Sequence, residues 1–577
     1  MEKYTYQRQC QSAKTAKTLD HGLYIAEQNP AATMPKTVGV IGGGVAGLAA
    51  IKSSLDEGLL PICFEKSDDI GGLWNYSPTP QDGCPSVYSS CVINTSKEMT
   101  CYSDFPIPKE FPNFMHRSYF QKYLELYASH FKLREYIRFN RLVEKVEKGD
   151  NFEETGSWVI ISRDLQTGKI EREAVDFMMV CHGHLTEPNI PHLEGLKQFS
   201  GRVLHTHDFK DFHGFENKRV LVVGIGNSGS DVACVLSRHA EHVYISTRRG
   251  CYTIQRAGEF GQPFDQVAIQ RWVQGIPVSL MRPIHYHKIN YRYRHRDYGL
   301  SPNFRFDAGV STISDDLPNR ILIGAISIKA DIKTFTKTGA IFEDGSEVKD
   351  IDVVILATGY NYSFPFLDSS IVKMEGHFSY LYKLIFPPNI HQNTFAVVGL
   401  VQPFGSLPPI LEIQARLASR VFAGRVELPP PSVMLSELEK RKAFLKTRYV
   451  DSARYTLQVY FIQYQDEIGS LIGCKPNLGR LFFTDPKLWY KMVFGPAVPT
   501  QWRLEGPGKW SGARNAIFSV REKTLYPMQT RKSGQNERDG LYDGWTCLLK
   551  KLCLCALVVM LLNWLFRNGL VTLLERL

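Results

Sequence analysis

The chain has 577 residues, of which 44% are hydrophobic and 22% charged, with a formal net charge of +10. This is the composition of a globular protein, and the length exceeds the size at which one hydrophobic core keeps growing, so two or more domains are expected. The 12 cysteines are scattered, without a C-x-x-C pair or a Cys/His spacing typical of metal sites, which argues against a disulfide framework or a zinc module.

Residues 1–35 form a polar, moderately basic extension that lacks the apolar core of a secretory signal peptide. We expect this extension to be disordered and the body of the protein to stay in the cytosol; a weak transit peptide is the alternative. Met34 would itself make a normal first residue, so Met1 and Met34 are both candidate starts.

A glycine-rich turn follows the first apolar run, residues 38–41, and precedes a helix-forming stretch at 48–55. In such a strand–turn–helix pattern the free N–H groups and the positive dipole end of the helix face a pyrophosphate, and the middle glycine lets the ligand approach the backbone. The pattern predicts a dinucleotide site made by Gly42, Gly43, Gly44, Val45, Ala46 and Gly47.

A second apolar segment, residues 60–64, ends in Glu65. An acid at this place in the motif accepts hydrogen bonds from ribose hydroxyls. The position suits an unphosphorylated adenosine ribose.

Two segments further along, 176–183 and 352–359, share the pattern of an acid, an apolar strand and a terminal glycine. We expect the first to carry the chain out of the first nucleotide-binding domain and the second to bring it back. The second domain would then be inserted in the first. An ordinary buried strand is an equal alternative for each segment.

A second glycine turn lies between the apolar strand 220–223 and a helix-forming stretch, and predicts a second dinucleotide site made by Gly224, Gly226, Ser228, Gly229, Ser230 and Asp231. The following strand, 243–246, runs into Thr247 and Arg248 with no acid at its end. A guanidinium there would pair with a 2′-phosphate, which favours NADPH over NADH. For Arg248 the alternative is an arginine that is merely solvated. For both glycine turns the alternative is a turn that serves packing and binds no ligand.

Basic residues alternate with tyrosines over residues 282–296. Such a pattern can bind nucleic acid or anionic lipid headgroups. A solvated helix face is favoured over both, and no nucleic-acid partner is expected.

The C-terminal residues 545–574 are strongly apolar, and residues 552–566 are broken only by Asn563. As a helix, 552–566 would extend roughly 22 Å at about 1.5 Å per residue, less than a hydrocarbon core of ~30 Å. We expect a membrane anchor, either spanning or lying in the plane; a buried soluble helix is the alternative.

Several segments together resemble the flavin-containing monooxygenases. Glu65 followed by a Gly-Gly-x-Trp loop resembles flavoprotein monooxygenases, and residues 199–209 fit the family string F-x-G-x-x-x-H-x-x-x-[Y/F]. Residues 93–99 are similar to the Asn-containing active-site segment of the family, and 356–360 to its Ala-Thr-Gly motif. The resemblance runs from Lys36 to the C-terminus. Phe209 stands where Baeyer–Villiger enzymes usually carry Trp, which favours the branch that oxidises heteroatoms.

The resemblance implies an enzyme that uses FAD, NADPH and O2, in which a hydroperoxyflavin passes oxygen to a soft nitrogen or sulfur centre of a small molecule. It implies that the loop of Gly72, Leu73 and Trp74 lies against the flavin, and that the segment of Ile93, Asn94 and Thr95 lines the same site. Asn94 is the expected catalytic residue, through a hydrogen bond; a turn-capping role is the alternative. His205 and Phe209 are expected to shape the link between domains.

The expected fold is α/β, with two Rossmann-like domains, the second inserted in the first, and a C-terminal membrane-associated helix. The expected divisions are an extension at 1–35, the FAD domain at 36–185 and 351–530, the NADPH domain at 186–350 with a basic insertion at about 250–320, and an anchor at 545–574. The expected location is the endoplasmic reticulum membrane with the catalytic body in the cytosol, and no metal is expected.

Three other functions stay open at this point: Baeyer–Villiger oxygenation of ketones, an NADPH oxidase that releases H2O2, and a non-catalytic nucleotide-binding membrane protein. Pyridine-nucleotide disulfide reductases also bind two nucleotides, but they need a redox-active cysteine pair beside the flavin. Cys84, Cys91 and Cys101 are spaced too irregularly for that role.

Overall fold

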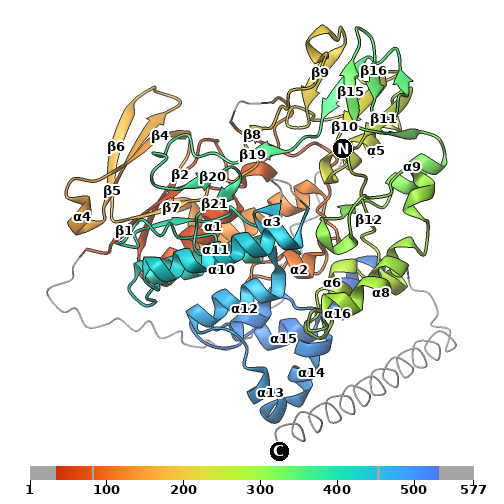
Figure 1. Cartoon of the computed structure of the whole chain (residues 1–577). Helices are drawn as coiled ribbons and strands as arrows, with labels where there is room; N and C mark the ends of the chain where they lie inside the picture. The colour runs from red at the N-terminus through yellow and green to blue at the C-terminus, as the bar shows by residue number, and fades with distance from the viewer. Residues whose placement is uncertain (1–33, 81–82, 451–454, 532–577) are drawn as a thin grey trace, which may run out of the picture.

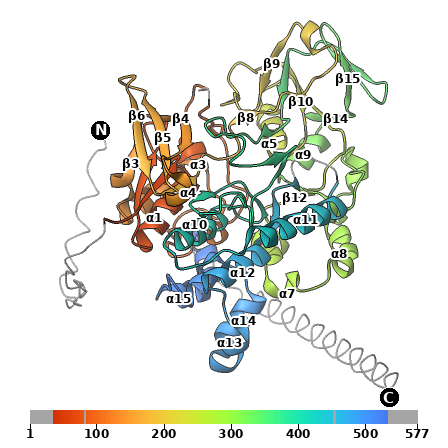
Figure 2. The ribbon, with the colours of Figure 1, turned by 60° about the vertical axis from the view of Figure 1, so that its left-hand side comes forward.

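The computed structural model describes residues 34–80, 83–450 and 455–531. The predicted disordered extension, apart from its last two residues, and the predicted anchor at 545–574 lie outside these ranges. Among the described residues, no helix combines the length and apolarity that crossing a membrane requires. The described chain has an α/β fold with two parallel sheets, which lie apart from each other in both ribbon views (Figures 1 and 2).

The first glycine turn belongs to a five-stranded parallel sheet with the order β22-β7-β1-β2-β3. Its strands are β1 (Thr37–Ile41), β2 (Leu60–Phe64), β3 (Ile137–Arg138), β7 (Phe177–Val180) and β22 (Phe395–Val397). Every residue of β7 and β22 is buried, as expected for parallel strands that are covered on both faces. β7 and β22 are neighbours although the whole second unit lies between them in the sequence.

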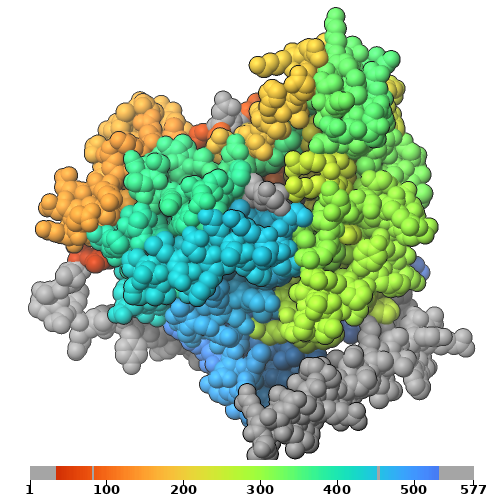
Figure 3. Space-filling model, in the orientation of Figure 1, coloured from red at the N-terminus to blue at the C-terminus, as the bar shows by residue number. Residues whose placement is uncertain are grey.

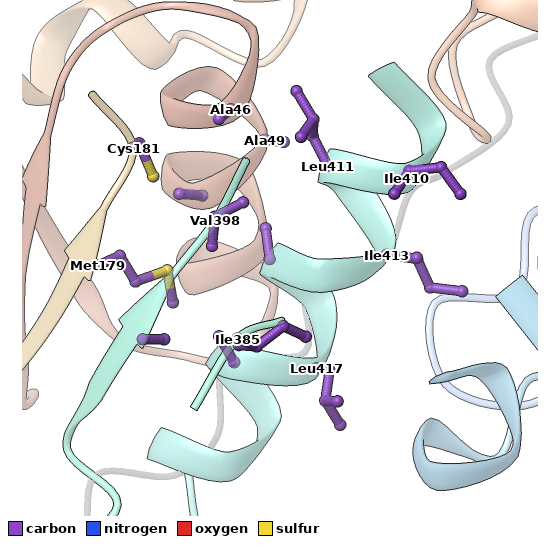
Figure 4. Packing of buried hydrophobic residues seen from close by; sticks show 14 of the residues in the cluster. Ala46, Ala49, Met179, Cys181, Ile385, Val398, Ile410, Leu411, Ile413 and Leu417 are labelled. Carbon is purple, nitrogen blue, oxygen red and sulfur yellow. The ribbon is translucent and has the colours of Figure 1, made fainter. Parts of the chain in front are cut away.

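Helix α1 (Val45–Asp56) packs against α10 (Pro408–Phe422), a helix from the distant C-terminal half of the chain. Figure 4 shows Ala49 of α1 beside Leu411 of α10, with Met179 and Val398 in the same cluster of buried residues. Small residues on α1 let the two helices approach closely, and the contact fixes the C-terminal half to the first glycine turn.

An antiparallel three-stranded sheet and a helix complete the first unit. These elements are β4 (Arg141–Lys148), β5 (Trp158–Asp164), β6 (Ile170–Val175) and α3 (Arg117–His130), with the short helices α2 (Lys97–Thr100) and α4 (Phe152–Thr155). They precede β7, the strand from which the chain leaves the first sheet.

The second glycine turn belongs to another five-stranded parallel sheet, with the order β14-β11-β10-β18-β9. Its strands are β9 (Arg202–His205), β10 (Arg219–Val223), β11 (His242–Ser246), β14 (Ile326–Lys329) and β18 (Val353–Leu356), with the helices α5 (Asn227–Leu236) and α9 (Leu317–Leu322). The antiparallel strands β15 (Ile332–Phe335), β16 (Ala340–Phe342) and β17 (Glu347–Val348) follow β14. In Figure 3 this unit forms the yellow and green lobe at the upper right.

Strand β18 corrects one sequence-based expectation. Residues 352–359 were expected to bring the chain back to the first sheet, but β18 pairs in parallel with β10 and β9 of the second sheet. The return comes directly afterwards, where β19 (Tyr360–Asn361) pairs with β8 (Glu187–Pro188). The end of the second unit, expected at residue 350, therefore falls just before Tyr360.

The basic insertion begins after β11 and ends before β14. It contains β12 (Thr253–Ile254), β13 (Thr312–Ile313), α6 (Phe264–Ala268), α7 (Arg271–Gln274) and α8 (Val278–Asn290). Strands β12 and β13 pair in parallel, although more than fifty residues separate them. Helix α8 has no buried residue, which agrees with the favoured interpretation of the basic stretch as a solvated helix face.

The C-terminal part consists of short strands and helices that pack below the first sheet (Figure 1). Its elements are β20 (Met374–Glu375), β21 (Phe378–Ser379), β23 (Gln402–Phe404), α11 (Pro431–Arg448), β24 (Gln458–Tyr460), α12 (Phe461–Ile472), α13 (Leu478–Thr484), α14 (Pro486–Phe494), α15 (Ala513–Phe518) and α16 (Val520–Leu525).

A buried ion network joins this part to the first unit. Arg503 Nη2 lies 2.6 Å from Glu412 Oε1 and 2.9 Å from Asp104 Oδ2, and Lys52 Nζ lies 2.6 Å from the same Asp104 oxygen. The side chains of Arg503 and Glu412 are 2% and 3% exposed. Ions this deeply buried are stable only when paired, so the network ties α1 and α10, through Lys52 and Glu412, to the C-terminal segment.

Candidate functional site

The first glycine turn joins the end of β1 to the start of α1. Gly42 has φ = 99°, a conformation that favours glycine, and its N–H donates to Phe64 O at 2.9 Å. A Cβ atom at Gly47 would lie 1.8 Å from Gly42 O, so the helix can approach the strand only with glycine there. Packing within the protein therefore requires both glycines.

Gly44, the N-cap of α1, is not required by packing within the protein. Its φ of −77° is open to any residue, and an added Cβ would lie 3.5 Å from Gly72 Cα, an ordinary contact. No side chain caps the helix at this end. The N–H groups of the first helical turn, at Val45 and Ala46, thus have no capping side chain within the described part of the chain, and the residues present fit the pyrophosphate of a dinucleotide.

Glu65 lies at the end of β2, beside the first turn, as the sequence predicted. Its Oε2 accepts a hydrogen bond from Gly43 N at 2.5 Å, and its Oε1 accepts one from Ser67 N at 2.8 Å. The carboxylate is therefore held where a ribose bound along the turn would meet it.

The Gly-Gly-x-Trp loop also packs on the first turn. Gly71 N donates to Gly43 O at 3.1 Å, and residues Gly72–Trp74, including Leu73, form a short 3-10 helix. Trp74 makes an edge contact with Phe120, with ring centroids 4.8 Å apart. The loop, the acid and the first turn, which are separated in the sequence, thus meet at one edge of the first sheet.

The second glycine turn repeats this geometry between β10 and α5. Gly224 has φ = 110°, and a Cβ there would lie 2.6 Å from Ala357 O. A Cβ at Gly229 would lie 2.2 Å from Gly224 O, so this helix also approaches its strand through glycine. Gly226, the N-cap of α5, has φ = −67° and no side-chain cap, which leaves the helix N-terminus open as at the first turn.

A cavity of about 720 Å³ lies between the second glycine turn and residues 94–95 of the first unit. Its wall includes Gly226, Ser228 and Gly229 of the second turn and Asn94 and Thr95 of the other unit. Ile93 is buried next to them. Residues of the first turn and Glu65 are not part of this wall, so the cavity belongs to the second turn and to Asn94.

Arg248 lies at the cavity wall and is exposed. No hydrogen bond or ion pair of its side chain occurs within the described ranges, so its guanidinium is available to a ligand.

Two further residues expected at the second site are turned inward. Ser230 is buried, and Asp231 accepts a hydrogen bond from Tyr88 OH at 2.7 Å; neither lines the cavity. Burial raises the pKa of Asp231, while the Tyr88 hydroxyl acts in the opposite direction. Because Tyr88 belongs to the first unit, Asp231 connects the two units in this structure.

Asn94 is held by a residue that sequence analysis did not single out. Arg256 Nη2 donates to Asn94 Oδ1 at 2.7 Å, and Arg256 itself pairs with Asp315, with 2.8 Å between Nη1 and Oδ2. Arg256 also lines the cavity. It lies in the same insertion as the basic stretch 282–296, but outside that stretch, and no sequence motif marked it.

Two titratable groups in the cavity wall have shifted pKa values. Burial raises the pKa of Asp265 to about 6, against the hydrogen bonds that its carboxylate accepts from Ser96 N and Gln266 N. Burial lowers the pKa of His184, whose Nδ1–H donates to Gly399 O at 2.9 Å. His184 is therefore a neutral ring near pH 7.

The family described as Flavin-binding monooxygenase-like matches residues 35–565. The chain belongs to this family. Human flavin-containing monooxygenase 5 is 44% identical over 502 residues, covering 86% of this chain and 94% of that protein. A rabbit (Oryctolagus cuniculus) relative named dimethylaniline monooxygenase (N-oxide-forming) 2 is 43% identical over 504 residues, with the same coverage.

A solved structure of OTEMO in complex with FAD and NADP has a similar fold, with a TM-score of 0.57 and 16% identity, covering 75% of this chain and 97% of the other. By its membership of the flavin-binding monooxygenase-like family, this chain is a flavin-dependent monooxygenase. The two open helix N-termini agree with two dinucleotides in one chain.

Gly44→Val should give a folded protein without flavin. A Cβ atom at Gly44 would meet no protein atom of the described chain nearer than 3.5 Å, but the side chain would fill the space through which a pyrophosphate reaches the N-terminus of α1. The measurement is the ratio of flavin to protein absorbance after purification. Gly479→Val is the matched control, because Gly479 is exposed and its nearest contact is also 3.5 Å. A Gly44→Val protein that purifies with full flavin would show that this turn does not bind FAD.

Arg248→Ala should raise the KM for NADPH roughly ten- to a hundredfold and leave the KM for NADH nearly unchanged. Loss of a charge-assisted phosphate contact costs about 1.5–3 kcal/mol of binding free energy. NADH has no 2′-phosphate and so makes no such contact in the wild type. Steady-state kinetics with both nucleotides measure the difference. Equal losses with NADPH and NADH would remove Arg248 from the phosphate site.

Proposed function

We propose that this chain oxygenates soft nitrogen or sulfur centres of small molecules, with FAD at the first glycine turn and NADPH at the second. The observation that carries the proposal is the shared cavity, whose wall joins Gly226 and Ser228 of the second turn to Asn94 and Thr95. A nucleotide on the second turn would thus share one space with the segment expected to line the flavin. The rabbit relative named for N-oxide formation supports nitrogen as one acceptor.

The proposed FAD domain comprises residues 36–185 and 360–530, and the proposed NADPH domain residues 186–359. The first pair of ranges contains the sheet of β1 and the helices that cover it, and the last contains the sheet of β10. Both are proposed as Rossmann-like domains, because each has a parallel sheet with a glycine turn at the carboxyl end of a central strand.

The cofactor-binding residues come from both units. The N-termini of α1 and α5 bind the two pyrophosphates, Glu65 accepts hydrogen bonds from the adenosine ribose of FAD, and Arg248 pairs with the 2′-phosphate of NADPH. The loop of Gly72, Leu73 and Trp74 lies against the flavin. Bound FAD would supply the redox chemistry that links NADPH to O2.

Asn94 is the proposed catalytic residue. Its Oδ1 is taken by Arg256, so its Nδ2 is the atom that can donate to a group in the cavity. Apolar wall residues, among them Phe264, Ile269 and Phe404, exclude water from the same space. Exclusion of water favours oxygen transfer to the substrate over the release of H2O2.

We also propose that residues 545–574 attach the enzyme to the endoplasmic reticulum membrane, with its catalytic body in the cytosol. The apolar composition of this segment supports the attachment. The basic, exposed helix α8 would add attraction to anionic headgroups, which salt screens.

The purified enzyme should convert N,N-dimethylaniline and thioanisole, an aryl sulfide, to the N-oxide and the sulfoxide with one NADPH consumed per product. Asn94→Ala should keep its FAD and its reduction by NADPH but form less product per NADPH, with H2O2 making up the difference. Loss of a buried hydrogen bond costs about 1–3 kcal/mol, which corresponds to a roughly five- to a hundredfold change in partition.

Asn113→Ala is the control for this experiment, because Asn113 also makes a side-chain hydrogen bond, to Thr524 O at 2.8 Å, but does not line the cavity. An ester formed from cyclohexanone, with no N-oxide or sulfoxide, would replace the proposal with ketone oxygenation. H2O2 as the sole oxidised product would indicate an oxidase. A normal product ratio in Asn94→Ala would make Asn94 a structural residue.

Truncation before Trp545 should release the protein from membranes in high salt and leave its flavin spectrum unchanged. High salt removes headgroup attraction, so what remains measures the apolar tail. Sedimentation with microsomal membranes compares the two forms. Full-length protein that leaves the membranes in salt alone would contradict the proposed anchor.

A further inference from the structure

Arg256 and Asp315 are brought together by the pairing of two short parallel strands. In the register of β12 and β13, Thr253 lies opposite Thr312 and Ile254 opposite Ile313. Arg256 and Asp315 each follow two residues after the end of their strand, so the pairing places them side by side. This explains why two residues so distant in sequence form an ion pair.

Asp315 holds both the backbone and the side chain of Arg256. Its Oδ1 accepts from Arg256 N at 2.8 Å, and its Oδ2 accepts from Arg256 Nη1, also at 2.8 Å. The Arg256 side chain is 15% exposed, so little solvent competes for it. With its backbone N–H and its Nη1 both bound to one carboxylate, the arginine has its planar guanidinium, and so its Nη2, held in a fixed direction.

One of these N–H groups sets the orientation of Asn94. Arg256 Nη2 lies 2.7 Å from the Asn94 carboxamide, and a guanidinium has donors only. The atom that faces it must therefore be the carbonyl oxygen Oδ1, although oxygen and nitrogen of a carboxamide are otherwise hard to tell apart. The NH2 group of Asn94 is turned away from Arg256. With Oδ1 bound by Arg256, Nδ2 is the Asn94 atom that has no partner among the described residues and is able to donate in the cavity.

The strand that carries Asp315 is attached to the second glycine turn. Thr312 Oγ1 donates to Ile225 O at 2.7 Å, and Ile313 N donates to Asn227 Oδ1 at 2.9 Å. Ile225 and Asn227 lie within the turn that is proposed to bind NADPH. An unbroken series of contacts therefore runs from this turn through β13 and Asp315 to Arg256, and from Arg256 to Asn94 of the other unit.

We propose that Arg256, held by Asp315, is the positioning residue that fixes the Asn94 carboxamide as a hydrogen-bond donor toward the cavity. The proposal rests on the proposed role of Asn94. It explains how the Asn94 side chain, in the FAD unit, is oriented by a residue of the NADPH unit. Arg256 acts through Asn94 and has no separate role in oxygen transfer.

The test compares Arg256→Met, Asn94→Ala and the double variant as FAD-loaded enzymes. Methionine keeps most of the side-chain volume and removes every donor. Arg256→Met should lower the product formed per NADPH roughly fivefold or more, in the same direction as Asn94→Ala, with flavin content and the anaerobic rate of reduction by NADPH unchanged. The double variant should be no worse than Asn94→Ala alone, because both changes remove one function.

A second readout does not depend on turnover. Crystal structures of the FAD-loaded wild type and Arg256→Met should differ in the rotamer of Asn94, which is held in the first and released in the second. Arg238→Met is the control variant, because Arg238 pairs with Asp316, next to Asp315, but has no contact with Asn94. Its product ratio should equal that of the wild type.

Several outcomes would overturn the inference. An unchanged product ratio in Arg256→Met would do so, and so would a double variant much worse than Asn94→Ala, because Arg256 would then act independently of Asn94. If Arg256→Met loses its flavin, Asp315→Ala takes its place: Asp315 is 44% exposed and does not line the cavity, and its loss should lower the ratio in the same non-additive way. A normal product ratio in Asp315→Ala would then show that Asp315 does not act on Asn94 through Arg256.

These outcomes are separable from failure of the proposed function. If the wild type forms no N-oxide or sulfoxide, or if Asn94→Ala is fully coupled, the proposed function fails. The inference about Arg256 alone fails in one case: the wild type and Arg256→Met both form one product per NADPH, and Asn94→Ala forms less.

Discussion

The fold depends on two helices that begin directly against the ends of buried strands. A Cβ atom at Gly47 or Gly229 would lie within about 2 Å of the carbonyl oxygen of the first glycine in its turn, so no other residue permits this approach. The same closeness brings each helix N-terminus to the carboxyl edge of its sheet. The acid and the Gly-Gly-x-Trp loop lie at this edge of the first sheet, and the second glycine turn, at this edge of the second sheet, lines the cavity. Binding chemistry thus follows from a packing constraint.

The C-terminal half stabilises this arrangement from a distance. Helix α10 lies along α1, and the buried ion network of Arg503, Glu412 and Asp104 links the two helices to the last described segment. Because breaking one member of a buried ion pair costs several kcal/mol, these elements hold as one body. The first turn is therefore supported by residues that lie hundreds of positions away in the sequence.

Local patterns in the sequence were sufficient to predict both glycine turns and the place of Glu65, because a strand, a turn and a helix are specified by neighbouring residues. The loop at Gly72 was expected from the family resemblance. The sequence could not decide which sheet β18 joins, because its pattern of acid, apolar run and glycine is shared with β7 and only pairing separates them. Arg256 was missed because its partners, Asn94 and Asp315, are distant in sequence. Asp231 was expected to face a ligand, but its carboxylate is bound by Tyr88, a contact that no local pattern encodes.

The pairing of β8 with β19 has a further consequence. The two chain crossings between the units are hydrogen-bonded to each other, with Asn189 N donating to Gly359 O at 2.9 Å, so the second unit enters and leaves at one point. A unit whose two ends adjoin can be inserted in a host without spreading the strands of the host sheet, and β7 and β22 indeed remain neighbours. An exchange of residues 186–359 for the corresponding unit of a relative therefore needs only two junctions, which lie next to each other.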